Sequence, residues 1–178
     1  MPTRRTPRKL DEHELWNYAL KALGRRPHSV AELRRKLAQR AASREALDGA
    51  MGKLREYDLV NDGRFSEQFA TSRLENQGLG RWRVLRDLRG KQIAGSVAQA
   101  AVEKTFAGKD ELELVEQFLA RKYRGKNLPE LLREEKHLAS VYRRLRTAGF
   151  SNTASLAILK KFRSDVPEIE ESDDETQC

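Results

Sequence analysis

The sequence contains very little of what catalysis, metal binding or redox chemistry requires. Its only cysteine is Cys178, which excludes an internal disulfide and a zinc site built from thiolates. Its three histidines are scattered, and no H-E-x-x-H, G-x-S-x-G or Walker-type G-x₄-G-K-[ST] motif occurs. The carboxylates Asp62 and Glu67 are better explained as a turn residue and a solvated helix residue than as a catalytic pair. We therefore expect no enzymatic activity, no cofactor and no metal.

Long apolar runs and strand-forming patterns are also missing. No stretch of about 18 apolar residues could span a membrane, and the basic N-terminus lacks the apolar run of a secretory signal. We therefore expect a cytoplasmic protein. Alternating runs of Val, Ile and Thr are absent, while hydrophobic residues make up 38% and charged residues 35% of the chain. This balance favours short amphipathic helices, so the sequence predicts an all-α fold.

One pattern of apolar residues occurs three times. Its copies are Leu33-x₃-Leu37-x₄-Ala42, Val84-x₃-Leu88-x₄-Ile93 and Val141-x₃-Leu145-x₄-Phe150. They start 51 and 57 residues apart, and a period of this length is typical of a repeated helical unit. We expect a tandem array of three three-helix repeats flanked by two disordered segments. The expected boundaries are a basic arm at 1–9, repeats at 10–61, 62–108 and 109–163, and an acidic tail at 164–178.

Several helix starts and buried faces can be predicted from local patterns. A helix should begin near Asp11, and Ser29-x-x-Glu32 and Ser96-x-x-Gln99 have the spacing of capping boxes. Ser151 or Asn152 should cap the last helix. Apolar residues at helical spacing should form the buried faces of the first and last helices. These residues are Trp16, Leu20 and Leu23 in the first helix, and Leu156, Leu159 and Phe162 in the last.

The net charge of +8 hides a strong asymmetry along the chain. Residues 164–178 contain seven acidic and no basic residues, so residues 1–163 contain 35 basic against 20 acidic residues and have a net charge of +15. A body this positive attracts nucleic acid or an acidic protein surface. Arginine predominates among the cations, and its planar fork suits bidentate contact with phosphate or carboxylate.

The basic residues recur at matching places in the three repeats and are the candidate contacts with a polyanion. Trp82 lies between two arginines at a helix start, where its indole could stack on a base or simply pack on the preceding helix. The candidates are Arg25, Arg26, Arg34, Arg35 and Lys36 in repeat one; Arg73, Arg81, Trp82, Arg83, Arg86, Arg89 and Lys91 in repeat two; and Lys122, Arg124, Arg143, Arg144 and Arg146 in repeat three.

Three motifs resemble signatures of the RecX family, bacterial regulators of the RecA recombinase. They are Arg26-Pro27-His28-Ser29-Val30-Ala31-Glu32-Leu33-Arg34-Arg35-Lys36-Leu37, then Asn61-Asp62-Gly63-Arg64-Phe65-Ser66 followed by Ser72-Arg73, then Leu145-Arg146-Thr147-Ala148-Gly149-Phe150-Ser151. No single motif is specific, but their order is. The sequence departs from the family pattern at helix ends: Ala41-Ala42 replace Gly-Phe, Arg81 replaces a proline, and Gln92 replaces a glycine.

The resemblance implies an elongated, curved array of three-helix repeats that binds the RecA filament on single-stranded DNA. It further implies a monomeric protein that regulates DNA repair, recombination and the SOS response, most often by inhibiting or disassembling the filament. A DNA-binding regulator of the helix-turn-helix type, without a RecA partner, is the alternative. The spread of basic residues over three repeats, and the scarcity of Asn and Gln beside them, count against that alternative.

The acidic tail leads to a first prediction. Seven acidic residues tethered to a body of charge +15 should compete transiently with nucleic acid for the basic surface. A chain truncated after Arg163 should therefore bind DNA more tightly than the full chain at low salt, as measured by fluorescence anisotropy. Equal affinities would instead leave the tail as a solubilising segment.

Overall fold

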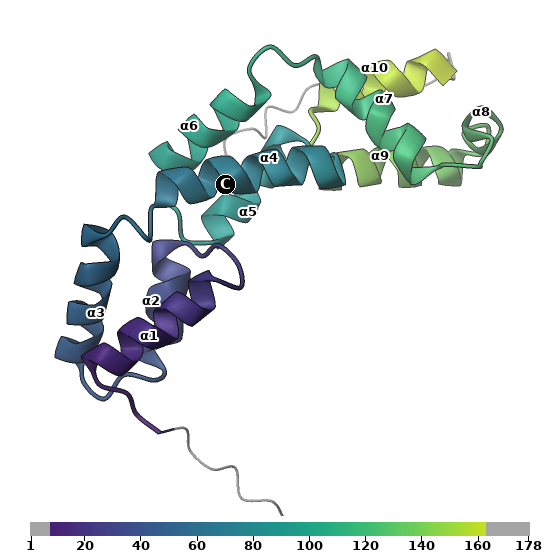
Figure 1. Cartoon of the computed structure of the whole chain (residues 1–178). Helices are drawn as coiled ribbons and strands as arrows, with labels where there is room; N and C mark the ends of the chain where they lie inside the picture. Colours follow the sequence, from purple (N-terminus) through teal and green to yellow (C-terminus); the bar gives the residue numbers. More distant parts are fainter. Residues whose placement is uncertain (1–7, 163–178) are drawn as a thin grey trace, which may run out of the picture. The chain divides into compact units, whose positions relative to one another are not determined.

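The computed structural model describes residues 8–162 (Figure 1). The predicted acidic tail, and all but residues 8 and 9 of the predicted basic arm, lie outside this range. The described residues form ten helices and no strand, with one isolated bridge between Leu10 and Ala41. The predicted all-α class is therefore confirmed. The helices are α1 (Glu12–Leu23), α2 (Val30–Ala38), α3 (Arg44–Glu56), α4 (Asp62–Gln77), α5 (Arg81–Gly90), α6 (Gly95–Phe106), α7 (Glu111–Lys122), α8 (Leu128–Leu131), α9 (Glu135–Ala148) and α10 (Asn152–Phe162).

The described residues separate into two compact units. Unit A contains the residues up to Ser66 together with Arg89–Ala98, and unit B contains Glu67–Leu88 together with the residues from Gln99 onwards. Helices α4, α5 and α6 each contribute residues to both units. The boundaries of the three expected repeats therefore stay a prediction.

In unit A, helices α1, α2 and α3 enclose one apolar core. The first helix begins where predicted: Asp11 accepts a hydrogen bond from the Glu14 amide at 2.8 Å, and Glu14 accepts one from the Asp11 amide at 3.2 Å. The predicted face of α1 is correct in part, since Trp16 and Leu23 are half-buried and pack against the core. Leu15, Ala19 and Ala22 are buried, whereas Leu20 is 39% exposed. The two alanines let α1 approach α3 closely, and this packing decides which of two overlapping apolar stripes turns inward.

The two predicted capping boxes have different outcomes. The Ser29 side chain accepts a hydrogen bond from the Glu32 amide at 3.1 Å, as expected of an N-cap. The Glu32 carboxylate, however, binds Arg26 and Lys91 in place of the Ser29 amide. The box at Ser96 is wrong, because α6 already begins at Gly95 and the Ala94 carbonyl accepts from the Ala98 amide.

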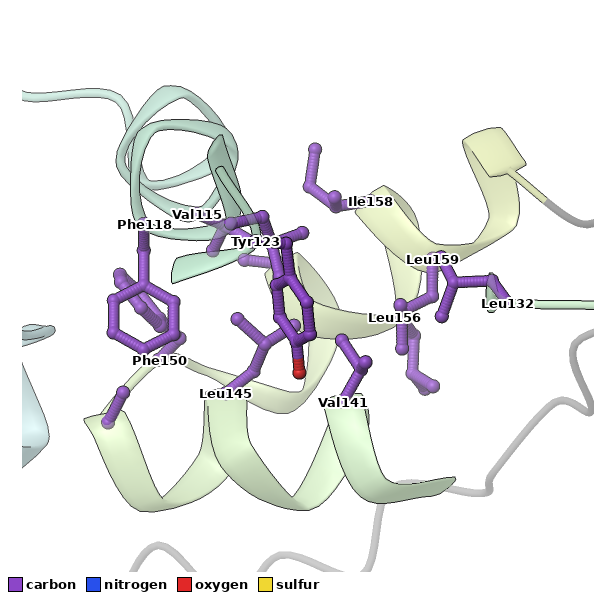
Figure 2. Packing of buried hydrophobic residues seen from close by; sticks show 13 residues of the cluster. Val115, Phe118, Tyr123, Leu132, Val141, Leu145, Phe150, Leu156, Ile158 and Leu159 are labelled. Carbon is purple, nitrogen blue, oxygen red and sulfur yellow. The ribbon is translucent and has the colours of Figure 1, made fainter. Parts of the chain in front are cut away.

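In unit B, helices α7, α9 and α10 pack around a second apolar core (Figure 2). The rings of Phe118 and Phe150 meet edge to face, with centroids 5.5 Å apart. Figure 2 shows Tyr123 between them and α10, with its hydroxyl oxygen turned toward the helix that carries Val141 and Leu145. The core therefore holds α7 and α9 at a fixed separation.

The last helix is capped by Ser151, as predicted, since its side chain accepts a hydrogen bond from the Ala154 amide at 3.1 Å. Its predicted buried face is correct for Leu156 and Leu159 and wrong for Phe162, which is 38% exposed. Ile158 is fully buried in its place, because α10 lies between two helices and buries a face wider than one stripe.

Eight of the nine repeated apolar positions are buried, and the exception is Ala42 in the first copy. The first two members of the pattern are buried in each copy, and the last member is buried at Ile93 and Phe150. Just before these last members, Gln92 and Gly149 adopt left-handed φ angles of 59° and 91°. The first copy ends differently: Leu10 donates to the Arg40 carbonyl and accepts from the Ala42 amide, which leaves Ala42 exposed. The expected irregularity of the helix end at residues 41–42 is thus a real difference in backbone pairing.

Two glycines let the start of α5 rest directly on the end of α9 within unit B. The Gly80 amide donates to the Ala148 carbonyl at 2.8 Å, and the Trp82 amide donates to the Gly149 carbonyl at 3.2 Å. A Cβ atom added at Gly80 would overlap the Gly149 carbonyl, and one added at Gly149 would overlap the backbone of Arg83. Only residues without a side chain permit this contact.

Replacing Gly149 tests the contact. Gly149→Ala combines a left-handed φ with a steric clash, so it should lower the free energy of unfolding of unit B by about 2–5 kcal/mol. Gly125→Ala is the matched control, because Gly125 has a φ of 76° and nothing within 4 Å of an added Cβ; it should cost about 1 kcal/mol. Urea unfolding followed by circular dichroism measures both, and equal losses would contradict the steric argument.

Candidate functional site

Unit B contains a hollow of about 670 Å³ that we call the basic groove. Helices α5, α7 and α9 and the end of α4 form its walls. Five of its side chains are cationic, and none of the described residues that line it is a carboxylate. The lining residues are Gln77, Leu79, Arg83, Phe118, Arg121, Lys122, Ser140, Arg143, Arg144, Thr147 and Ala148.

Helical periodicity explains how these side chains reach one groove. On α9, Ser140, Arg143, Arg144 and Thr147 recur at intervals of three and four residues and share one face. Phe118 on α7 and Ala148 on α9 belong to the core and also line the groove, so they mark the border between the two. Exposed cations beside them on each helix face the groove: Arg121 and Lys122 on α7, and Arg143 and Arg144 on α9.

Three of the five cations are held in place by the surrounding structure. Arg83 donates to Asp87 at 2.9 Å and to the Thr147 carbonyl at 3.2 Å. Arg121 donates to the Glu75 carbonyl at 3.2 Å. Arg144 donates to the Tyr123 hydroxyl at 3.0 Å, and its guanidinium lies 5.6 Å from the centroid of the same ring.

The other two cations, Lys122 and Arg143, are exposed and have no ion pair or side-chain hydrogen bond with any residue between 8 and 162. They are free to contact an anion without first breaking an internal bond.

The structure brings together only part of the predicted contact set. Of the candidates, Arg83, Lys122, Arg143 and Arg144 line the groove. Two others reach its edge: Arg86 donates to the Thr147 carbonyl at 3.4 Å, and Arg73 contacts Asp87 at 3.5 Å.

The remaining candidates of α5, α7 and α9 lie outside the groove lining. Arg146 donates to the Phe150 carbonyl at 2.8 Å, and Arg81 and Arg124 are exposed. Trp82, at the first turn of α5, is 41% exposed and so is not packed into the core. Its role as a stacking residue stays a prediction.

Arg121 was missed by the sequence analysis. The predicted contact set included its neighbours Lys122 and Arg124 but not Arg121 itself. Helical spacing could have found Arg121, because Phe118, Arg121 and Lys122 stand at positions i, i+3 and i+4.

The candidates of unit A are partly neutralised by carboxylates of the chain itself. Glu32 accepts two hydrogen bonds from Arg26 at 3.0 Å each and one from Lys91 at 3.1 Å. These contacts, that with Arg26 first, lower the pKa of Glu32 to about 2, while burial lowers the pKa of the adjacent His28. Arg34 pairs with Asp48. Arg25, Arg35 and Lys36 have no such partner among the described residues, and Arg89, also assigned to unit A, is exposed.

Residues 8–162 offer neither a membrane-spanning helix nor a metal-binding cluster. No helix in that range is long and apolar enough to cross a membrane. The same range holds no group of three or more His, Cys, Asp or Glu side chains that could bind a metal ion.

The fold and the groove describe an all-α protein of helical repeats with a concentrated basic surface. Family models of "RecX, first three-helix domain" and "RecX, second three-helix domain" match residues 16–54 and 61–102. The chain belongs to the RecX family of regulatory proteins.

Individual relatives agree with this assignment. Regulatory protein RecX of Ectopseudomonas mendocina is 36% identical over 117 residues, which cover 65% of this chain and 75% of the relative. That of Haemophilus influenzae is 31% identical over 113 residues, covering 63% and 72%. The crystal structure of RecX from Lactobacillus salivarius matches with a TM-score of 0.65 at 21% identity, covering 85% of this chain and 96% of that one; at this identity the match supports the fold alone.

The Glu32 contacts lead to a prediction about stability and pH. Because the pKa of Glu32 is lowered to about 2 from 4.5, the ionised carboxylate stabilises the folded state fully above pH 4.5, and this contribution is lost as the pH falls toward 2. Glu32→Gln should cost about 1–2 kcal/mol at pH 7, after allowance for solvent screening. The difference from wild type should shrink between pH 4.5 and pH 2.

Urea unfolding at pH 7 and at pH 3 measures this difference. Glu56→Gln, at an exposed position of the same unit, is the control and should change the free energy of unfolding by less than about 0.5 kcal/mol at either pH. A loss for Glu32→Gln that is the same at both pH values would show that the charge of Glu32 is irrelevant.

Proposed function

We propose that this chain binds the RecA filament assembled on single-stranded DNA and inhibits its recombinase activity. Membership of a family of regulatory proteins supports a regulatory role. The observation that carries the rest is the basic groove, where five cations converge with no carboxylate among the described lining residues. Such a surface attracts a dense polyanion, and a nucleoprotein filament offers phosphates and acidic protein groups together.

The proposed mechanism is binding without covalent chemistry. A protein seated along the filament would occupy the space that a second DNA strand must enter during strand exchange. It would also stand in the way of the next recombinase subunit during filament growth. Both effects require only that the protein binds the filament and is large enough to block access to it. The proposal therefore includes a cytoplasmic location, where the DNA is.

A sequence-specific DNA-binding regulator is less well supported. Base edges are read mostly by arginine, asparagine and glutamine side chains that are free to form paired hydrogen bonds. Among the described lining residues the one amide side chain is that of Gln77, whose oxygen already accepts from Arg73 at 2.7 Å. The five cations of the groove suit contacts with phosphates, which are the same whatever the base sequence.

Strand exchange and ATP hydrolysis by the cognate recombinase test the proposal. Added in amounts stoichiometric with the recombinase, the protein should slow both reactions, because it removes or blocks active filament. Polylysine of matched total charge is the control for simple sequestration of DNA, and it should inhibit less at the same charge concentration. If both rates are unaffected at stoichiometric amounts, the proposed function is wrong.

A further inference from the structure

We infer that the basic groove of unit B is the site where this protein contacts the sugar–phosphate backbone of single-stranded DNA, and that the cations of unit A add little to that contact. The inference rests on the proposed function for the choice of single-stranded DNA. The inference goes beyond the proposed function because it assigns the single-stranded DNA to one groove. The sequence pattern, in contrast, predicts three equal basic surfaces.

The electrostatics of the groove favour several phosphates at once. Its five cations come from three helices. Among the described residues, Asp87 is the carboxylate that pairs with one of them: it contacts Arg83 at 2.9 Å and, at the groove edge, Arg73 at 3.5 Å. One carboxylate shared by two arginines leaves a positive charge even at that edge. A neighbouring anion therefore meets an attractive potential along the whole groove.

The partners of the held arginines preserve their charge. Arg121 and Arg144 donate to a backbone carbonyl and a phenol, which are neutral acceptors. A guanidinium has five N–H donors, so donors remain for a phosphate oxygen after these bonds are made. Fixed side chains also lose less entropy on binding than free ones, and this favours Arg121 and Arg144 as anchors while Lys122 and Arg143 adapt.

The rest of the lining suits a strand of any sequence. Leu79 provides half-buried apolar surface beside the cations, whereas Phe118 and Ala148 are buried and contribute little. Apolar surface accepts sugars and base faces without distinguishing one base from another. Combined with phosphate contacts, it predicts binding that depends on salt and hardly on sequence.

Single-stranded DNA fits the groove better than an acidic protein surface does. DNA carries one charge per nucleotide in an unbroken row, so it can satisfy several clustered cations together. A protein would need an equally dense row of carboxylates, whose mutual repulsion opposes folding. In unit A, by contrast, carboxylates of the chain already occupy Arg26, Lys91 and Arg34, and DNA would have to displace them.

The experiment compares two double variants with equal loss of charge within unit B. Lys122→Ala with Arg143→Ala removes the two groove cations that have no ion pair with a described residue, while Arg124→Ala with Lys126→Ala removes two exposed cations outside the groove lining. Binding of the full chain to a fluorescein-labelled oligo(dT) strand is followed by anisotropy between 50 and 200 mM salt, with no recombinase present. Thermal unfolding by circular dichroism verifies that each variant is folded.

The groove variant should bind about tenfold more weakly at 100 mM salt, and its plot of log K against log salt should be shallower by about 1.4, or 0.7 for each lost phosphate contact. The control variant should stay within about twofold of wild type. Arg25→Ala with Arg35→Ala in unit A should also stay within about twofold.

Equal weakening in all three variants would overturn the inference, since bulk charge alone would then explain binding. Displacement of oligo(dT) by polyglutamate at equal charge concentration would assign the groove to acidic protein instead. Strand exchange separates this inference from the proposed function. If the wild-type protein inhibits strand exchange but the groove variant binds oligo(dT) normally, only the inference is contradicted. If the groove variant binds oligo(dT) more weakly but the wild-type protein does not inhibit strand exchange, only the proposed function is contradicted.

Discussion

The contact on which the groove depends is the direct stacking of the start of α5 on the end of α9. Two backbone hydrogen bonds, from Gly80 and Trp82 to the carbonyls of Ala148 and Gly149, join the helices with no side chain between them. This brings Arg83 against the last turn of α9, where it donates to the Thr147 carbonyl. The cations of α5 and α9 can share one wall only because both glycines lack a Cβ.

A similar joint occurs in unit A with a different electrical outcome. The Ser29 hydroxyl donates to the Lys91 carbonyl at 2.9 Å, and the Val30 amide donates to Asp62 at 2.9 Å. The first turn of α2 thus rests on the residue that follows α5. Arg26 and Lys91 form ion pairs with the largely buried Glu32 at this joint, and these pairs stabilise unit A. In the basic groove of unit B, Lys122 and Arg143 have no ion pair with a described residue. The placement of a single carboxylate therefore decides whether the cations beside such a joint are paired within the chain.

Much of the fold could be predicted from the sequence, because apolar spacing and N-cap residues are local signals. The buried pairs Leu33 and Leu37, or Val141 and Leu145, follow directly from a period of 3.6 residues. The face of α1 could be predicted only in part, since the stripes of Trp16 and Leu15 both have helical spacing and only packing on α3 chooses between them. The groove could not be predicted for a similar reason: Arg83 and Thr147 are 64 residues apart, and no local pattern places them together.

The sequence predicts basic surfaces of equal strength in the three repeats, and the structure shows that they differ. Charge counting treats Arg26 and Arg143 alike, although the first meets Glu32 and the second meets no carboxylate among the described residues. Asp87 contacts two arginines at the edge of the basic groove, so this edge keeps a net positive charge. It orients Arg83 through one oxygen while Arg73 approaches the other, so the pair of arginines gains a defined position and keeps an excess positive charge. Pairing an arginine with a carboxylate usually fixes the side chain but cancels its charge. Here the single carboxylate of Asp87 contacts both Arg83 and Arg73, so the arginines are held in place and one positive charge remains.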